Sequence, residues 1–371
     1  MNEEIFSNVS KIIERDSKST TYKFGLLRGT IEIIQENSPF LNFKDGKVYI
    51  PMGLLIEKWM IYYYPIFESE TLIPQINGNS RLSFATQLNE LVAFYRQKGG
   101  LSVFYNDLKR NTIPEEINSL VLNLAGSLNN TLRNMPMYHL GRSISSHFHS
   151  IFKPELKANR VKGKVDSEFL IKNFGTFSIP MDYYQAFRLL GSFIIGQDSI
   201  LFKWAEFSVK ASSQTSQLSI QHVIENVLKS PVTERDSKDS KKIFNDILKI
   251  EGETHCVWTG KKVQRIEVDH VIPFVIWKNN DLWNLLPSNP QTNNTKRDKI
   301  PSPALIENRK DIILHYWGIV DSRMNSRFQK EIRISLVGDD KSKDWGEAAI
   351  NQLKSTCSFL IEKRGFEKWE I

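Results

Sequence analysis

The sequence predicts a mainly helical protein of several domains, α+β overall, in which a small strand–strand–helix unit is embedded. Three observations lead to this prediction. Apolar residues recur at helical spacing over most of residues 1–229. A charged, proline-containing stretch interrupts the chain at 230–241, and short β-prone runs followed by a capped helix fall within 242–301. At 371 residues, the chain has the length of two or three domains that each bury a core.

The first region, 1–229, is predicted to be built mainly from helices because its apolar residues repeat every three or four positions. A small hairpin is expected after the second helix, since Asp45-Gly46 supplies the positive φ angles of a tight turn. The expected helices span residues 2–13, 22–34, 53–63, 84–97, 101–109, 114–133 and 182–210. We assign this region to DNA binding, targeting or a partner interface, and its sequence leaves these three alternatives open.

The stretch 230–241 is the best candidate for a linker because it is charged, rich in small residues and contains a proline. It separates 1–229 from a domain at 242–301 that carries the most informative residues. Beyond that domain, 302–371 is predicted to be helical and to pack on it.

Helices are expected in this C-terminal region over 301–316 and 326–336, because apolar residues again recur at helical spacing. Asp344 opens a third helix as a variant of the capping box. Cys357 falls on the apolar face of that helix, so a buried and inert thiol is expected.

Composition excludes several classes of protein. The chain is 40% hydrophobic and 25% charged, as in ordinary globular proteins rather than disordered or collagen-like ones. Its two cysteines cannot form a disulfide framework or a four-cysteine zinc site, which favours a reducing compartment. The acidic N-terminus and the lack of a long apolar run argue against a secretion signal or membrane span, so we expect a cytoplasmic protein. A net charge of +7 favours a polyanionic partner.

Residues 256–301 combine strand, turn and helix signals in a short span. Two β-prone runs, Cys256–Trp258 and Arg265–Val268, flank a turn sequence, which predicts a two-stranded unit with a loop. Asn289 is a good N-cap and a proline follows it at the first helical position. A helix of about two turns is therefore expected over 290–298.

Polar residues suited to metal-assisted hydrolysis gather on this scaffold. Asp269 and His270 are adjacent at the end of the second predicted strand, and Asn293 lies one turn into the helix. Carboxylate and amide oxygens suit a hard cation such as Mg²⁺, which takes few protein ligands and keeps several waters. A neutral imidazole can accept a proton from water near neutral pH. These are the residue types that phosphodiester hydrolysis requires.

The stretch resembles the HNH endonuclease family with its ββα-metal fold. The resemblance rests on Asp269-His270 followed by an apolar pair and a proline, and on Asn284 followed by a leucine. It also rests on the Asn-x-x-Lys pattern of Asn293 and Lys296. It implies that His270 is the general base and that Asp269 and Asn293 bind the catalytic metal. Asn284 would brace the loop and orient His270 through a hydrogen bond.

Five basic residues are assigned to DNA contacts, and they are Lys296, Arg297, Lys299, Lys261 and Lys262. They flank the predicted catalytic residues on the helix and on the first loop. Lys296 is expected either to contact phosphate or to support the helix from its exposed side.

Many relatives carry two Cys-x-x-Cys pairs that bind a structural zinc, and this sequence departs from that pattern. Of the cysteines in these two pairs, this sequence has only Cys256. Thr292 stands where a cysteine would precede Asn293. Because Cys256 alone cannot hold tetrahedral zinc, we predict no structural zinc. The unit should instead be held by packing of Trp258, Ile266, Ile272, Trp283 and Leu285.

The resemblance implies a metal-dependent endonuclease that hydrolyses double-stranded DNA with one Mg²⁺, or Mn²⁺ in its place. One site cuts one strand, so nicking is the expected product. The arrangement is similar to stand-alone HNH nucleases of bacterial restriction and anti-phage defence, such as the HNH component of a Zorya-type system. Its partners would then be defence-system proteins or a second copy of the chain. An RNA-directed nuclease, a modification-dependent nuclease and a DNA-binding regulator with a silent HNH fold stay open as alternatives.

Overall fold

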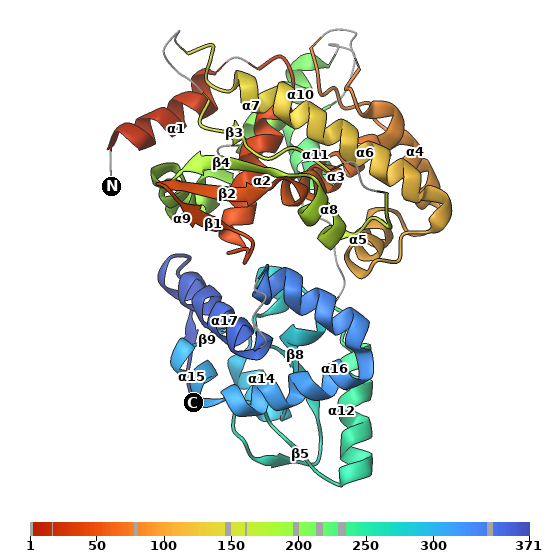
Figure 1. Ribbon diagram of the computed structural model, residues 1–371, viewed down its shortest axis with the longest axis vertical. Helices are drawn as coiled ribbons and strands as arrows, with labels where there is room; N and C mark the ends of the chain where they lie inside the picture. Colours follow the sequence, from red (N-terminus) through yellow and green to blue (C-terminus); the bar gives the residue numbers. More distant parts are fainter. Residues whose placement is uncertain are drawn as a thin grey trace. The chain divides into compact units, whose positions relative to one another are not determined.

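The structure is a computed structural model in which the chain divides into two compact units, 1–231 and 232–371 (Figure 1). The structure describes residues 3–16, 18–77, 81–144, 150–159, 162–195, 200–212, 218–228, 235–339 and 344–371. Both units are mainly helical and contain small sheets, in agreement with the predicted fold class. Among the described helices, none is both long and apolar enough to cross a membrane.

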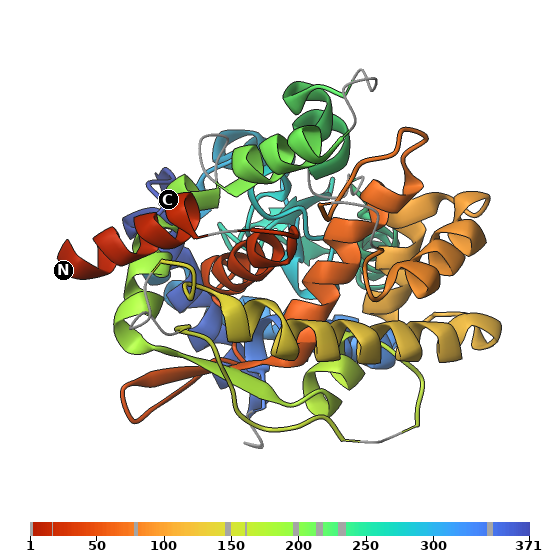
Figure 2. The same ribbon diagram turned by 90° about the horizontal axis from the view of Figure 1, so that it is seen from above.

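The first unit packs its helices around one large core and beside one small sheet (Figure 2). Its helices are α1 Glu3–Arg15, α2 Tyr22–Gln35, α3 Met52–Glu68, α4 Ala85–Arg96, α5 Gly100–Arg110, α6 Glu115–Asn134, α7 Pro136–His139, α8 Ser167–Asn173, α9 Met181–Ile195, α10 Ile200–Ala211 and α11 Ile220–Val223, which continues into the π-helix η1 Ile224–Leu228. Its strands are β1 Asn42–Lys44, β2 Lys47–Pro51, β3 Lys153–Pro154 and β4 Thr176–Pro180, all paired antiparallel in the order β1-β2-β4-β3.

The predicted hairpin and most of the predicted helices of this unit are confirmed. Asp45 and Gly46 have φ angles of 51° and 69°, which are the positive values that a two-residue hairpin turn requires. The helix predicted over 182–210 is described in two parts, α9 up to Ile195 and α10 from Ile200, and residues 196–199 lie outside the described residues. Strand β4 was not predicted, since its five residues become a strand by pairing with β2, which is distant in the sequence.

The described residues of the second unit form helices and three two-stranded sheets. Its helices are α12 Lys238–Glu251, α13 Phe274–Trp277, the 3₁₀-helix η2 Leu282–Asn284, α14 Pro290–Lys296, α15 Pro303–Asn308, α16 Lys310–Ile332, the π-helix η3 Arg333–Val337 and α17 Trp345–Glu362. Its strands are β5 Thr254–His255, β6 Lys262–Val263, β7 Glu267–His270, β8 Leu285–Ser288, β9 Ile300–Pro301 and β10 Lys368–Trp369. Strands β5 and β6 pair antiparallel, as do β7 and β8, whereas β9 and β10 pair parallel.

The strand prediction for this unit needs one correction. Residues Cys256–Trp258 are not a strand: Cys256 O accepts a hydrogen bond from the main-chain N of Gly260, at 2.8 Å, which closes a turn. Strand β7 is close to the predicted second strand, but its partner is β8. Local β-propensity identified the apolar residues but could not tell a turn from a strand, because pairing depends on distant residues.

The predicted linker also needs correction. Residues 229–234 lie outside the described residues, but α12 begins at Lys238, within the stretch 230–241. Its apolar residues Ile243, Phe244 and Ile247 are buried in the second unit. The charged residues Lys238, Asp239 and Lys241 of that stretch lie on the exposed face of this amphipathic helix. The second unit therefore includes residues before 242.

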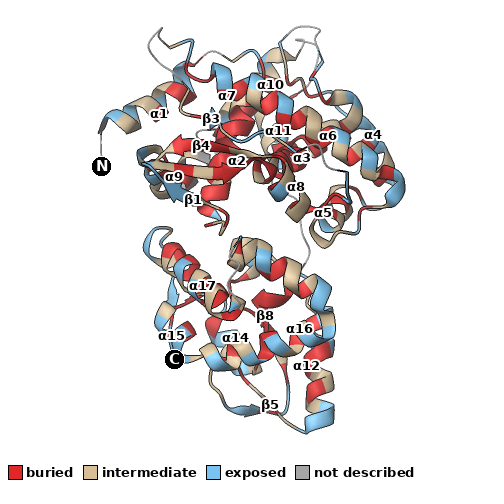
Figure 3. Cartoon of the chain, in the orientation of Figure 1, coloured by how far each residue is buried: buried red, intermediate tan, exposed pale blue. Residues whose placement is uncertain are grey.

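One hydrophobic core joins the predicted domain at 242–301 to the C-terminal helices. All five predicted packing residues are buried in it: Trp258, Ile266, Ile272, Trp283 and Leu285. Trp317 of α16 and Cys357 of α17 belong to the same cluster, and β8 is buried along its whole length (Figure 3). Burial raises the pKa of Cys357 to about 12, so this thiol is inert as predicted.

The C-terminal helices differ from the prediction mainly at their ends. The helix expected over 301–316 is divided at Arg309, where α15 ends and α16 begins. The prediction for Asp344 is confirmed, because its side chain accepts a hydrogen bond of 3.1 Å from the main-chain N of Glu347. Strand β10 follows and brings Trp369 against Trp258, with ring centroids 5.3 Å apart.

Candidate active site

The candidate site lies where helix α14 packs against strand β7. The predicted N-cap is confirmed: Asn289 Oδ1 accepts a hydrogen bond of 2.7 Å from the main-chain N of Thr292. The antiparallel pairing of β7 with β8 places His270 opposite Leu285 and Glu267 opposite Ser288. The site therefore combines residues from two strands, one helix and the loop that joins β7 to β8.

Asp269 is buried, and both its carboxylate oxygens have donors. Trp258 Nε1 donates to one oxygen at 2.6 Å, and Lys296 Nζ contacts the other at 3.2 Å. Burial raises the pKa of Asp269, while the positive charge of Lys296 and the bond from Trp258 act in the opposite direction. Trp258, which donates this hydrogen bond, also packs against Trp369, and this packing holds its indole in place.

Lys296 corrects the prediction for the basic residues. Its side chain has no exposed surface, and Nζ also donates to the carbonyl oxygen of His270 at 2.5 Å. It cannot contact phosphate from this position, and it supports the helix from the buried side rather than the exposed one. The reason is helical spacing, because Lys296 follows Asn293 by three residues and so shares the face of α14 that covers β7.

His270 is also buried, with 2% of its surface exposed. Its Nε2 lies 3.3 Å from Asn280 Oδ1, and its ring packs near Phe274 with centroids 5.5 Å apart. Nδ1 is buried and has no hydrogen-bond partner among the described residues. Burial lowers the pKa of His270 to about 4, so the imidazole is neutral at pH 7.

Asn284 braces the loop that follows β7, as expected. Its Oδ1 accepts from the main-chain N of Ile272 at 2.8 Å, and its Nδ2 donates to the carbonyl of Ile272 at 3.0 Å. Its own carbonyl accepts from the main-chain N of Val271 at 2.8 Å. The expected bond from Asn284 to His270 is not found, because Asn280 holds that position. Sequence reasoning missed Asn280. It is adjacent to Asn279 in the loop after β7, and no motif in the sequence shows which of the two asparagines faces His270.

Asn293 contacts a carboxylate that the sequence analysis did not single out. Its Nδ2 donates to Glu267 Oε2 at 2.8 Å, which leaves the amide oxygen of Asn293 available to another partner. Glu267 and Asp269 are two residues apart on β7 and therefore lie on the same face of the strand. Helix α14 contacts both of them, Glu267 through Asn293 and Asp269 through Lys296.

The donor set fits a hard divalent cation that keeps most of its waters. Within the described ranges, no group of three or more His, Cys, Asp or Glu side chains could hold a metal alone. Mg²⁺ commonly takes only one or two protein ligands together with waters and substrate phosphate. Each oxygen of Asp269 has a second lone pair beyond its present bond, and Asn293 has its amide oxygen. Asp269 and Asn293 would hold such an ion.

The other predicted DNA contacts lie on the surface of the unit. Lys261 and Lys262 are exposed at the β5–β6 turn, and Lys262 forms an ion pair with Glu253. Arg297 is exposed at the end of α14, and Lys299 pairs with Glu367 at 2.5 Å. An open hollow of about 590 Å³ follows the exposed face of α14, and its lining residues are Gln291, Asn294, Thr295, Arg297 and Lys299.

Arg235 is a further basic residue that the sequence analysis placed in the linker. It is exposed and makes no hydrogen bond or ion pair with another described residue. Its positive charge lowers the pKa of both Asp269 and His270, so it lies close to the site. The adjacent main-chain N of Asp236 donates to Asn280 Oδ1 at 3.0 Å, which fixes this segment beside His270.

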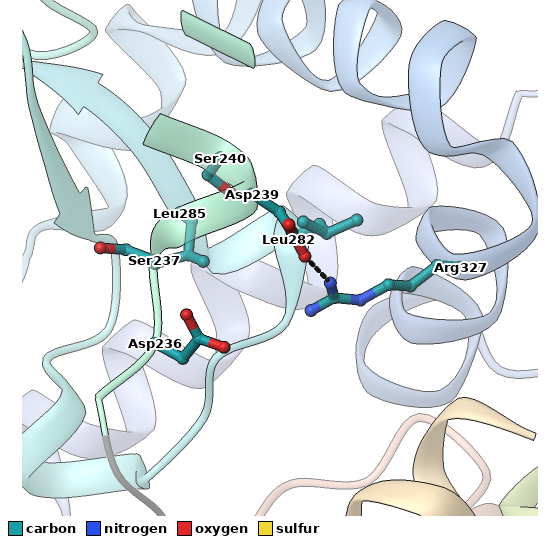
Figure 4. Close-up of a pocket in the computed structure, with 7 residues that line it drawn as sticks. All are labelled: Asp236, Ser237, Asp239, Ser240, Leu282, Leu285 and Arg327. Carbon is teal, nitrogen blue, oxygen red and sulfur yellow. Dashed lines mark hydrogen bonds and ion pairs between the residues drawn. The ribbon is translucent and has the colours of Figure 1, made fainter. Parts of the chain in front are cut away.

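A network of charged side chains holds the loop between β7 and β8, which carries Asn280 and Asn284. Glu331 accepts from the main-chain N of Leu282 at 2.6 Å, and Arg327 pairs with Glu331 at 2.6 Å and Asp239 at 2.7 Å. Figure 4 shows Arg327 reaching Asp239 beside the start of α12 and η2. The recess between them leaves no space for a ligand, so it is structural.

Comparisons with known families give a match in each unit. The model of the DUF8808 family, a domain of unknown function, matches residues 2–227, which is more than half of the chain. The chain belongs to the DUF8808 family. An HNH endonuclease model matches residues 256–302 of the same protein. No curated protein and no solved structure matches this DUF8808 protein.

The HNH match covers a short part of this DUF8808 protein but contains Asp269, His270, Asn284 and Asn293. It indicates a nuclease of the HNH type, which is a hydrolase with a nucleic acid substrate and, in general, a divalent metal. Arg235 lies outside the matched segment.

Proposed function

We propose that this DUF8808 protein is a metal-dependent DNA endonuclease whose second unit hydrolyses one phosphodiester bond per site. The observation that carries the proposal is the state of His270 within the HNH match. The imidazole is buried and neutral, and its Nδ1 has no partner among the described residues. A nitrogen in this state can accept a proton from water, and Asp269 and Asn293 lie at the adjacent β7–α14 contact.

The residues of the site then take separate roles. His270 accepts the proton of the attacking water, while Asn284 fixes the loop that follows it. Asp269 and Asn293 hold a divalent cation, Mg²⁺ or Mn²⁺, and Lys296 holds the carboxylate of Asp269 in place. When bound, the cation supplies stabilisation of the negative charge that develops on the phosphate oxygens.

Double-stranded DNA is the substrate that we assign to this surface. The hollow along the exposed face of α14 contains Arg297, and Lys261 and Lys262 project from the β5–β6 turn. One site contacts one phosphodiester, so a single binding event nicks one strand. We assign DNA binding, target choice or partner binding to the first unit. We further propose that the protein acts in the cytoplasm of a bacterial cell, in restriction or anti-phage defence.

The test is conversion of supercoiled plasmid to the open-circle form by the full-length protein in Mg²⁺, Mn²⁺ or EDTA. The proposal expects nicking in either metal and intact plasmid in EDTA. The same metals are then applied to RNA and to plasmid with modified bases. Cutting of RNA alone would replace DNA as the substrate, and cutting of modified DNA alone would establish modification dependence. DNA binding without cutting on every substrate would indicate a silent HNH fold.

Chelation is expected to separate catalysis from folding. EDTA should abolish nicking but leave the thermal unfolding midpoint of the freshly purified protein unchanged, because the core around Trp258 and Trp283 is formed by side-chain packing. Cys256 is buried and its Sγ lies 3.5 Å from Ser288 Oγ, a contact that needs no zinc. Circular dichroism melts of freshly purified protein with and without EDTA make the measurement. A large fall in the midpoint would mean that a structural metal is present.

Arg235 is expected to contact substrate phosphate. Replacing it with glutamine should weaken DNA binding about tenfold and reduce the slope of log affinity against log salt by about 1. The control is Lys242→Gln, which removes the same charge from the exposed face of α12. Fluorescence anisotropy of a labelled duplex at several salt concentrations gives both slopes. Equal slopes for the two variants would contradict the role of Arg235.

A further inference from the structure

Two hydrogen-bond donors converge on the side-chain oxygen of Asn280. The main-chain N of Asp236 lies 3.0 Å from Oδ1, and His270 Nε2 lies 3.3 Å from the same atom. A main-chain N–H can only donate, so the Asn280 atom that faces Asp236 must be the amide oxygen. That oxygen can only accept, and therefore His270 Nε2 must carry the hydrogen.

The protonation of one imidazole nitrogen decides the state of the other. In a neutral imidazole with hydrogen on Nε2, Nδ1 has a lone pair and no hydrogen. Nδ1 of His270 is buried without a hydrogen-bond partner among the described residues. Most buried polar atoms have a partner, so an unpartnered nitrogen requires an explanation. Proton transfer from water to this lone pair would supply one.

We propose that Asn280 is a positioning residue that holds His270 with hydrogen on Nε2 and directs Nδ1 to the attacking water. The proposal rests on the assigned nuclease function and adds the atom that acts as base and the residue that fixes it. Asn284, which the HNH resemblance suggested for this task, uses its side chain on the main chain of Ile272 and Asn279 instead.

The backbone on both sides of Asn280 is held firmly enough for this role. Asn279 and Asp281 exchange two hydrogen bonds, with Asp281 N donating to Asn279 Oδ1 and Asn279 Nδ2 donating to Asp281 Oδ2, each at 2.7 Å. The next residue, Leu282, donates its N–H to the buried carboxylate of Glu331. Asn280 is therefore fixed between two anchored neighbours.

The segment before α12 becomes part of the active site through this contact. Asp236 lies well before Cys256, where the HNH match begins, and beside the first residues of α12 (Figure 4). Its N–H orients the amide of Asn280, and that amide orients His270. The support of the base therefore extends beyond the segment that the HNH family model covers.

Two substitutions in the full-length protein test the role of Asn280. Asn280→Leu keeps a similar size but removes the acceptor, and it should lower kcat for nicking about 10- to 100-fold with little change in the half-saturating DNA concentration. Asn280→Asp keeps an oxygen that accepts from both donors, so its kcat should stay within about threefold of wild type. Equal losses in the two variants would overturn the proposal.

A spectroscopic measurement tests the same assignment without any need for activity. In protein labelled with ¹⁵N-histidine, the signals of His270 are assigned by comparison with His270→Gln. Wild type and Asn280→Asp should show a protonated Nε2 and an unprotonated Nδ1, and Asn280→Leu should lose the protected Nε2–H signal. Hydrogen on Nδ1 in wild type would overturn the proposal. Protein that gives the expected spectrum but cuts no substrate would refute the nuclease function while supporting the tautomer.

The contribution of Asp236 is tested by a matched pair of variants. Asp236→Pro and Asp236→Ala both remove the carboxylate that accepts from the main-chain N of Lys238 at 3.1 Å, but only proline removes the N–H. The proline variant should resemble Asn280→Leu in kcat and in its Nε2–H signal, and the alanine variant should resemble wild type. Identical behaviour of the two would overturn the role assigned to the Asp236 N–H.

Discussion

Replacing Lys296 with alanine is expected to destabilise the second unit by about 3 to 5 kcal/mol, because it leaves the carboxylate of Asp269 buried without its cation. The side chain of Asp269 is 4% exposed and that of Lys296 is not exposed at all, so the carboxylate has little solvent to stabilise its charge once the lysine is removed. The hydrogen bond from Nζ to the carbonyl of His270 is lost as well. Urea unfolding of the full-length protein, monitored by far-ultraviolet circular dichroism, measures the change in the free energy of unfolding.

A surface variant and a double variant make this prediction specific. Lys299→Ala breaks the ion pair with Glu367, whose side chain is 68% exposed, and should cost less than about 1 kcal/mol. Combining Lys296→Met with Asp269→Asn removes both buried charges and should recover much of the stability that Lys296→Ala loses. Should Lys296→Ala unfold within about 1 kcal/mol of wild type, the buried ion pair would have little energetic importance.

Lys296 also illustrates where prediction from sequence succeeds and where it fails. The cap at Asn289 and the start of α14 were predicted because capping and helical propensity depend on neighbouring residues, although α14 ends at Lys296 rather than at 298. The face of α14 that contacts β7 was not predicted, since it depends on how the helix packs on a strand outside its own sequence. A lysine assigned to phosphate is therefore the buried partner of Asp269.

The same distinction applies to the strands and to the base. His270 was identified from its place beside Asp269, but its contact with Asn280 depends on the path of the loop between β7 and β8. Strand β8 was missed because it becomes a strand only by pairing with β7. Arg235 was read as part of a linker, because a charged stretch has the same composition whether it lies in solvent or beside a site.

His270→Ala is expected to lower the rate of plasmid nicking by about 10²- to 10⁴-fold, which is the usual contribution of a general base. The side chain of His270 is buried rather than on the surface that we assign to DNA, so DNA affinity should be nearly unchanged. Its Nδ1 makes no hydrogen bond with a described residue, so the substitution removes only the contact to Asn280 and the packing against Phe274. The effect should therefore fall on kcat rather than on binding.

The measurement is the initial rate of open-circle formation in Mg²⁺ with protein in excess, beside anisotropy binding to the same sequence. His315→Ala is the matched control, because His315 is an exposed histidine on α16 in the same unit, and it should nick at the wild-type rate. A loss below tenfold in His270→Ala would exclude this imidazole as the base. A loss of binding in step with the rate would instead make His270 a substrate contact, and the burial of its ring argues against that result.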